Sequence, residues 1–222
     1  MTVMEHKLVY QKRKALTIVI KNGDVTVKAP IGTPIERIER FVADKSAWLE
    51  KKLAEHGKRT DMLAPVLDGT HILLGGDFIE IRPTDGIKRV RLENGALSVP
   101  IKDDADVTRA VKNWFKRTAA DMLAHVLEMY SLSTGLEYTS FALTNAGGKW
   151  GSCDGNGNIR LNWRLVMLDD VLSGYVAVHE LAHTVHHDHS AGFWAEVEKH
   201  CPDYKALRKR LKNYSVLTTL YR

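Results

Sequence analysis

The sequence contains few cysteines and no long hydrophobic run. Two cysteines, Cys153 and Cys201, are too few for the disulfide framework of a small secreted scaffold. No segment approaches the ~20 apolar residues that a membrane-spanning helix needs, and residues 1–10 lack the apolar core of a signal peptide. We therefore expect a reduced, cytoplasmic protein without a membrane partner.

The charged residues are distributed unevenly. The 222 residues carry a net charge of +5, and residues 1–60 hold 13 Lys and Arg against 7 Asp and Glu. Such an amino-terminal basic excess is found on solvated polar surfaces, and also where a protein attracts nucleic acid, a nucleotide or an acidic peptide. A hydrophobic content of 44% in a chain of this length predicts a globular protein with one sizeable core, or a core domain with an accessory layer.

The most informative segment holds His179, Glu180 and His183 in the pattern His-Glu-x-x-His. Residues four apart lie on one face of a helix, where two imidazoles can bind one Zn²⁺ at about 2.0–2.1 Å each. Glu180 can then take a proton from water instead of binding the metal. The apolar residues from Val171 to Val185 predict a buried helix, capped by Asp169–Asp170.

A third metal ligand has to follow the end of this helix. His186 and His187 lie about 10 and 12 Å from His179 along a continuous helix, too far for one metal ion. His189 lies between a predicted break at Asp188 and a new helix that Ser190 can cap, and is free to point back; His200 lies further along. Three protein ligands leave a fourth position for water, as in catalytic zinc sites.

Several further motifs accompany the histidines. Together they are His179–His183, His189–Ser190, Phe193–Trp194, Cys201–Tyr204, Lys149–Cys153 and Gly157–Leu165, with the run from Lys12 to Pro30 and residues Ile38, Phe41 and Trp48. In these motifs the sequence resembles the YgjP-like family of predicted metal-dependent hydrolases. The resemblance implies a zincin-type fold whose metal site is similar to that of SprT-like proteases. It also implies that His179, His183 and His189 are the ligands and Glu180 the catalytic carboxylate.

Local patterns predict an α+β protein. Turn signals indicate three hairpins, over residues 16–30, 72–81 and 90–99, and helical spacing indicates helices over 35–53 and 105–130 and one from Asp203. Thr33–Glu36 reads as a capping box, residues 57–68 as a linker, and residues 138–143, 149–153 and 158–161 as short strands. We expect a β-hairpin-rich accessory region with one helix over residues 1–100, followed by a zincin-like catalytic domain over 101–222.

The resulting hypothesis is a hydrolase with one Zn²⁺ per chain, in which water activated by the metal attacks a peptide and Glu180 is the general base. An extended peptide would pair with a strand beside the metal, either Lys149–Ser152 or Asn158–Asn162. The first alternative is hydrolysis of a phosphoanhydride such as a nucleoside triphosphate, and the second is a nucleic-acid-associated module. The sequence assigns no substrate-binding residue.

Overall fold

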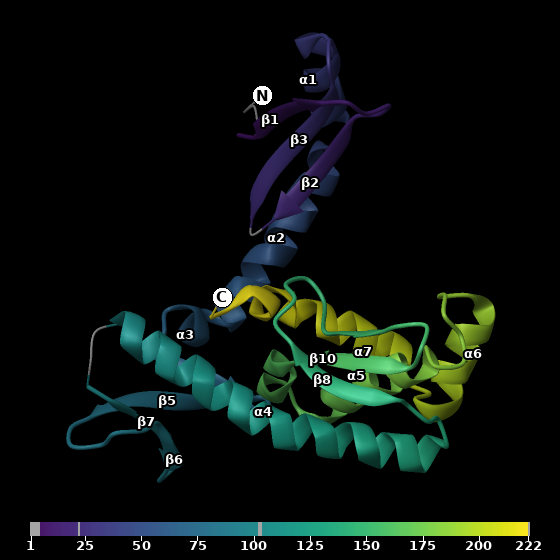
Figure 1. Ribbon diagram of the computed structural model, residues 1–222. Coiled ribbons are helices and arrows are strands. Elements are labelled where there is room, and N and C mark those ends of the chain that lie inside the picture. Colours follow the sequence, from purple (N-terminus) through teal and green to yellow (C-terminus); the bar gives the residue numbers. More distant parts are fainter. Residues whose placement is uncertain (1–4, 22, 102–103, 222) are drawn as a thin grey trace. The chain divides into compact units, whose positions relative to one another are not determined.

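The computed structural model describes residues 5–21, 23–101 and 104–221. Its contacts divide the chain into two compact units, residues 1–63 and 64–222, which we call the amino-terminal and the carboxy-terminal unit. Each unit has its own secondary structure and its own buried side chains (Figure 1).

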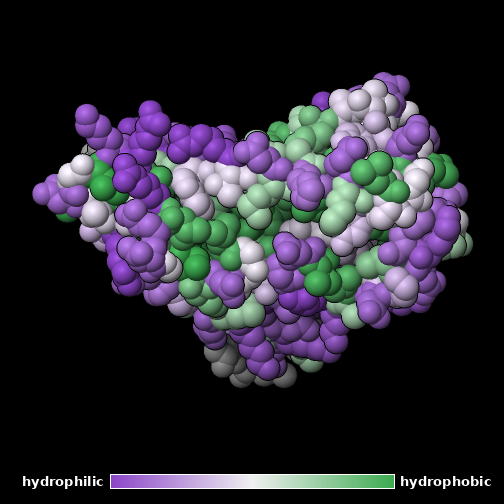
Figure 2. All heavy atoms as spheres, turned by 90° about the horizontal axis from the view of Figure 1, so that it is seen from below, coloured by the Kyte–Doolittle hydropathy of each residue, from purple (hydrophilic) through white to green (hydrophobic). Residues whose placement is uncertain are grey.

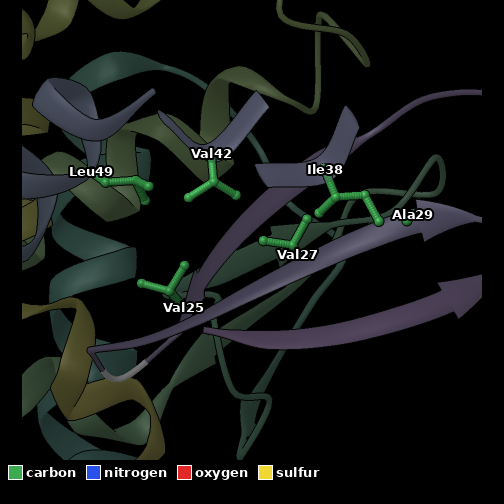
Figure 3. Close-up of a cluster of buried hydrophobic side chains, with 6 residues drawn as sticks. All are labelled: Val25, Val27, Ala29, Ile38, Val42 and Leu49. Atoms are coloured by element: carbon green, nitrogen blue, oxygen red, sulfur yellow. The ribbon is translucent and has the colours of Figure 1, made fainter. Parts of the chain in front are cut away.

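The amino-terminal unit packs two helices on one face of a three-stranded sheet. The strands are β1 (Lys7–Gln11), β2 (Thr17–Lys21) and β3 (Asp24–Pro30), and the helices are α1 (Ile35–Asp44) and α2 (Ser46–Met62). Strand β3 is central, parallel to β1 and antiparallel to β2, so the predicted first hairpin is confirmed. Alternate residues of β3 face the helices and form a core with them (Figure 3): Val25, Val27, Ala29, Ile38, Val42 and Leu49.

Three local predictions for residues 33–68 were wrong. The single helix expected over 35–53 is divided at Lys45, whose backbone (φ −104°, ψ 4°) leaves the helical region. The capping box does not form, because the Thr33 hydroxyl donates to the Pro30 carbonyl at 2.8 Å instead. The expected linker over 57–68 is helical, in α2 and in α3 (Ala64–Leu67), since Gly57 is tolerated inside the helix.

The carboxy-terminal unit begins with a four-stranded sheet in the order β4-β5-β7-β6. Its strands are β4 (His71–Leu74), β5 (Asp77–Thr84), β6 (Arg91–Glu93) and β7 (Ala96–Pro100). Both predicted hairpins are confirmed, and their turns use positive φ angles, for example 50° at Asn94 and 72° at Gly95. Strand β7 is buried along its whole length.

The long helix α4 (Asp104–Thr134) organises the rest of this unit. It packs against the short 3₁₀ helix η1 (Trp163–Met167) and against α5 (Asp170–Ala182) (Figure 1). Its buried residues recur every four positions: Val111, Phe115, Ala119, Leu123 and Leu127. This spacing is the pattern of a helix with one apolar face, and the expected helix over 105–130 is confirmed.

A three-stranded sheet lies beside α5 and completes the unit. Its strands β8 (Ser140–Thr144), β9 (Gly151–Cys153) and β10 (Asn158–Asn162) have the order β8-β10-β9, so β9 is an edge strand. The chain ends with α6 (Ala191–His200), α7 (Tyr204–Leu211) and the 3₁₀ helix η2 (Lys212–Thr219). The mixed α+β class is as predicted.

The boundary expected at residue 100 differs from the observed division after Leu63. The turn between β4 and β5 is tied to η1, because Gly75 N–H donates to Val166 O and Gly76 N–H to Met167 O, each at 2.9 Å. Strand β7 also packs on α4. Residues 64–100 therefore belong to the same unit as the predicted metal helix, and only residues 1–63 form a separate unit.

Hydrophobic side chains also reach the surface. They gather near the middle of the face shown in Figure 2, between hydrophilic side chains, and Met122, Met129 and Leu132 of α4 are exposed. None of the helices that the structure describes is both long enough and apolar enough to cross a bilayer.

Close packing between α4 and α5 generates the first prediction. A Cβ at Gly174 of α5 would lie 2.2 Å from the Tyr130 hydroxyl oxygen of α4, whereas a Cβ at Gly57 of α2 meets nothing within 4 Å. We expect Gly174→Ala to lower the free energy of unfolding by about 1–3 kcal/mol through overpacking. The matched change Gly57→Ala should raise it by about 0.5–1 kcal/mol. Chemical denaturation measures both, and an unchanged stability of Gly174→Ala would contradict the packing.

Candidate metal centre

Helix α5 places the predicted metal residues inside the carboxy-terminal unit. The Asp169 side chain caps its first turn by accepting from Leu172 N–H at 3.1 Å, as predicted, and Arg210 pairs with Asp169. The helix ends at Ala182, three residues before the expected end at Val185, and His183 is its C-cap residue. The chain therefore turns directly at the second histidine, which shortens the path to His189.

The three histidines named from the sequence converge. One ring nitrogen from each of His179, His183 and His189 lies within 4.8 Å of the other two, and Nε2 of His179 is 3.2 Å from Nε2 of His189. His189 precedes α6, and the Ser190 side chain caps that helix by accepting from Phe193 N–H at 3.4 Å, as predicted.

The other candidate histidines lie outside this cluster. His186 and His187 are in the turn after α5 and contribute no ring nitrogen to the group. Nε2 of His200 instead lies 2.9 Å from a Glu196 carboxylate oxygen, within α6.

Two of the rings, His179 and His183, are set up as neutral ligands. Nδ1 of His183 lies 2.9 Å from the His186 carbonyl oxygen, which only accepts, so Nδ1 carries the proton and Nε2 keeps a lone pair. Burial is the largest cause that lowers the pKa of His183. Burial, with the neighbouring histidines, lowers the pKa of His179 to about 3.

This donor set fits a divalent metal ion. Ligand distances of about 2.0–2.1 Å in a tetrahedral site place neighbouring nitrogens roughly 3.3 Å apart, close to the 3.2 Å between His179 and His189. Lone pairs at that separation repel each other unless a proton or a cation lies between them. Imidazole nitrogens are ligands that Zn²⁺, Cu²⁺, Fe²⁺ and Ni²⁺ accept.

Aromatic packing orients the histidine rings. Among the described residues, no carboxylate hydrogen-bonds to the three histidines, and Nδ1 of His179 is buried without a partner. The Phe193 ring stacks on His183 with centroids 4.3 Å apart, and it packs edge-on against His179 at 4.9 Å. In the sequence Phe193 stands out only as part of a family motif, and its packing against the histidine rings was not predicted.

Glu180 lies beside the cluster but does not join it. Its side chain is only 5% exposed and contacts the backbone of β9, where a Cβ on Gly151 would lie 2.6–2.8 Å from the carboxyl group. Burial raises the pKa of Glu180 to about 8, and the nearby Lys149 opposes this shift. A carboxyl group with a pKa near the working pH is suited to exchange protons.

A cleft of about 400 Å³ opens onto His179, Glu180 and His189. Residues 148–151 line one part of it, and Trp194, Arg208, Leu211 and Lys212 line another. Tyr175 also lines the cleft, and burial raises the pKa of its hydroxyl to about 12. Tyr204 is buried and stacks on Trp194.

A buried helix with His-Glu-x-x-His, a third histidine after a turn and an open cleft define a metallopeptidase-type site. The YgjP-like family model, described as a metallopeptidase domain, matches residues 14–214. The chain therefore belongs to the YgjP-like family. Membership makes it a metal-dependent hydrolase and implies a bound metal ion.

Two solved structures are similar to part of the chain. The metallopeptidase zymogen of Pyrococcus abyssi abylysin is 25% identical with a TM-score of 0.37, over 40% of this chain and 90% of that one. The zymogen of Methanocaldococcus jannaschii jannalysin is 20% identical with a TM-score of 0.34, over 40% and 96%. No curated protein matches the chain.

The histidine cluster generates the second prediction. His189→Ala should remove most of the bound metal, because two imidazoles hold a divalent ion much more weakly than three. His187→Ala is the matched control, since that exposed ring lies in the same turn but outside the cluster, and His186→Ala and His200→Ala should likewise keep the metal. The measurement is the metal content of the purified variants. Full metal occupancy in His189→Ala would contradict the proposed set of ligands.

The contact between Gly151 and Glu180 generates the third prediction. Gly151→Ala should displace the carboxyl group and reduce turnover by about 10²-fold or more, while the metal content stays normal. Gly155→Ala, in the loop between β9 and β10, meets nothing within 4 Å and should leave turnover unchanged. Parallel metal analysis and activity assays compare the two variants. Equal activity would show that Glu180 tolerates displacement.

Proposed function

We propose that this chain is a zinc-dependent peptidase in which His179, His183 and His189 hold one Zn²⁺ and Glu180 is the general base. The observation that carries the proposal is the convergence of three imidazoles beside a buried carboxyl group that lines a cleft. Bound zinc lowers the pKa of water to about 7 and polarises a carbonyl oxygen.

Glu180 would accept and then transfer the proton. Its carboxylate takes a proton from the attacking water and delivers it to the leaving nitrogen, two transfers that one group can perform when its pKa lies near the working pH. The backbone at Gly151 restricts the carboxyl group to the cleft side of α5, and Lys149 favours its charged form. Gly151 thus positions the Glu180 side chain, and Lys149, two residues earlier, lowers its pKa.

The sheet favours a peptide as the substrate. Strand β10 is paired on both sides, so Asn158–Asn162 is excluded as the strand that receives a substrate. Strand β9 pairs with β10 on one side only, and the segment 148–151 lines the cleft. An extended peptide can therefore add to the open edge of β9 through backbone hydrogen bonds.

A second candidate function is hydrolysis of a phosphoanhydride such as a nucleoside triphosphate. It is favoured by Lys149, Arg208 and Lys212, which line the cleft and could attract phosphates. The amino-terminal basic excess, which had suggested this alternative, belongs to the amino-terminal unit, where Lys12–Lys14 lie between β1 and β2. The nucleic-acid alternative stays a prediction from net charge.

The fourth prediction tests the proposed base. Glu180→Gln should keep the metal but lose about 10²–10⁴-fold in hydrolysis, because the amide preserves the shape and cannot accept the proton. The control Glu198→Gln removes an exposed carboxylate that pairs with Lys205 and should be fully active. The assay screens an unfolded protein, a peptide library and nucleoside triphosphates. Undiminished turnover would exclude Glu180 as base, and Glu180-dependent phosphate release without peptide cleavage would favour the second candidate.

A further inference from the structure

The cleft beside the metal centre carries an excess of positive charge. Three cationic side chains line it, Lys149, Arg208 and Lys212, and among the described lining residues Glu180 is the one carboxylate. Lys149 lies next to Glu180, which it influences electrostatically. Arg208 and Lys212 come from the last helices of the chain. Because Glu180 is the one lining carboxylate, the three cations outnumber the acidic groups among the described residues of the cleft.

Arg208 is held there by an aromatic stack. Its Cζ atom lies 4.7 Å from the centroid of the Trp194 ring. Trp194 in turn stacks on Tyr204, with centroids 5.2 Å and planes 14° apart, and it packs 5.6 Å from the ring of His189. Tyr204 lies one turn before Arg208 on α7 and is buried. The guanidinium is thus fixed against an aromatic ring that itself contacts a metal-site histidine.

The stack leaves the hydrogen-bond donors of Arg208 available. Lys205 and Arg210, on the same helix, pair with Glu198 and Asp169. Arg208 has no ion pair with any carboxylate in the part of the chain that the structure describes. A cation–π contact does not use the guanidinium N–H groups as donors to an oxygen, and their planar fork matches the two oxygens of a carboxylate.

We propose that Arg208 is a specificity-determining residue that binds a carboxylate of the peptide substrate, within a residue or two of the bond that is cleaved. The proposal rests on the peptidase function proposed above. The open edge of β9 and the apolar side chains of Val176, Trp194 and Leu211 in the cleft suit a peptide better than a bare phosphate chain. The carboxylate belongs to an Asp or Glu side chain or to the carboxyl terminus.

The first test, our fifth prediction, measures binding in metal-free protein, where no hydrolysis occurs. Calorimetry compares three peptides of one sequence: a blocked peptide with Glu, the same peptide with Gln, and the Gln peptide with a free carboxyl terminus. Arg208→Gln should weaken binding of a carboxylate peptide about 10- to 100-fold, the effect of losing a charge-assisted hydrogen bond, and leave the blocked Gln peptide unaffected. The peptide that responds identifies the source of the carboxylate.

Matched variants distinguish recognition of the carboxylate by Arg208 from a general effect of net charge and from loss of folding. Lys209→Gln removes the same charge from the same helix, but Lys209 does not line the cleft, so binding should stay within about twofold. Arg208→Lys keeps the charge and loses the planar fork, and should bind between wild type and Arg208→Gln. If Arg208→Gln unfolds, the comparison of Arg208→Lys with wild type still decides the question. In the metal-loaded enzyme, Arg208→Gln should raise KM for the carboxylate peptide more than it lowers kcat.

Three results would overturn the proposal. Wild-type protein could bind all three peptides equally, or Lys209→Gln could weaken binding as much as Arg208→Gln. Binding of pyrophosphate that depends on Arg208, without any preference for peptide carboxylates, would assign the residue to phosphate instead. Failure of the peptidase function is distinguishable, because it appears as full activity of Glu180→Gln or as absent peptide cleavage, while binding to metal-free protein is measured independently.

Discussion

The burial of α5 is the constraint on which the rest of the site depends. Helix α5 is packed against α4, η1, β9 and α6. Such a helix can carry polar side chains only where they contact other polar groups or line a cleft. Its last turn meets this condition, because His179 and Glu180 lie next to the cleft. Desolvation then keeps His179 neutral and raises the pKa of Glu180. The same burial that stabilises the unit thus sets the protonation states needed to bind a metal ion and to move a proton.

Much of the local structure could be predicted because its causes are local. The spacing of His179 and His183, the caps Asp169 and Ser190, and the glycine turns depend on residues a few positions apart. The placement of His189 could be inferred because helix geometry excluded the nearer histidines. The division of the helix at Lys45 and the end of α5 could not be predicted, because helix ends depend on tertiary packing as well as on propensity.

The remaining features depend on contacts between distant segments. Gly75 reaches Val166 across about ninety positions, so the boundary between the units was placed too late in the sequence. Lys149 and Arg208 line one cleft although they lie far apart in the sequence. The basic residues of the amino-terminal region are dense in the sequence and are therefore easy to notice. The cations of the cleft are far apart in the sequence and come together only in the folded structure.

His183, the C-cap residue of α5, is also one of the three histidines, so with the proposed ligand set the supply of metal would affect local order. A cation held by His183 and His189 would tie the end of α5 to the start of α6 through bonds that the polypeptide alone does not make. By mass action, a ligand at a hundred times its Kd adds about 2.7 kcal/mol to the stability of the state that binds it. The turn over residues 183–189 would then be more ordered when the metal is bound, and more open to proteolysis when the metal is scarce.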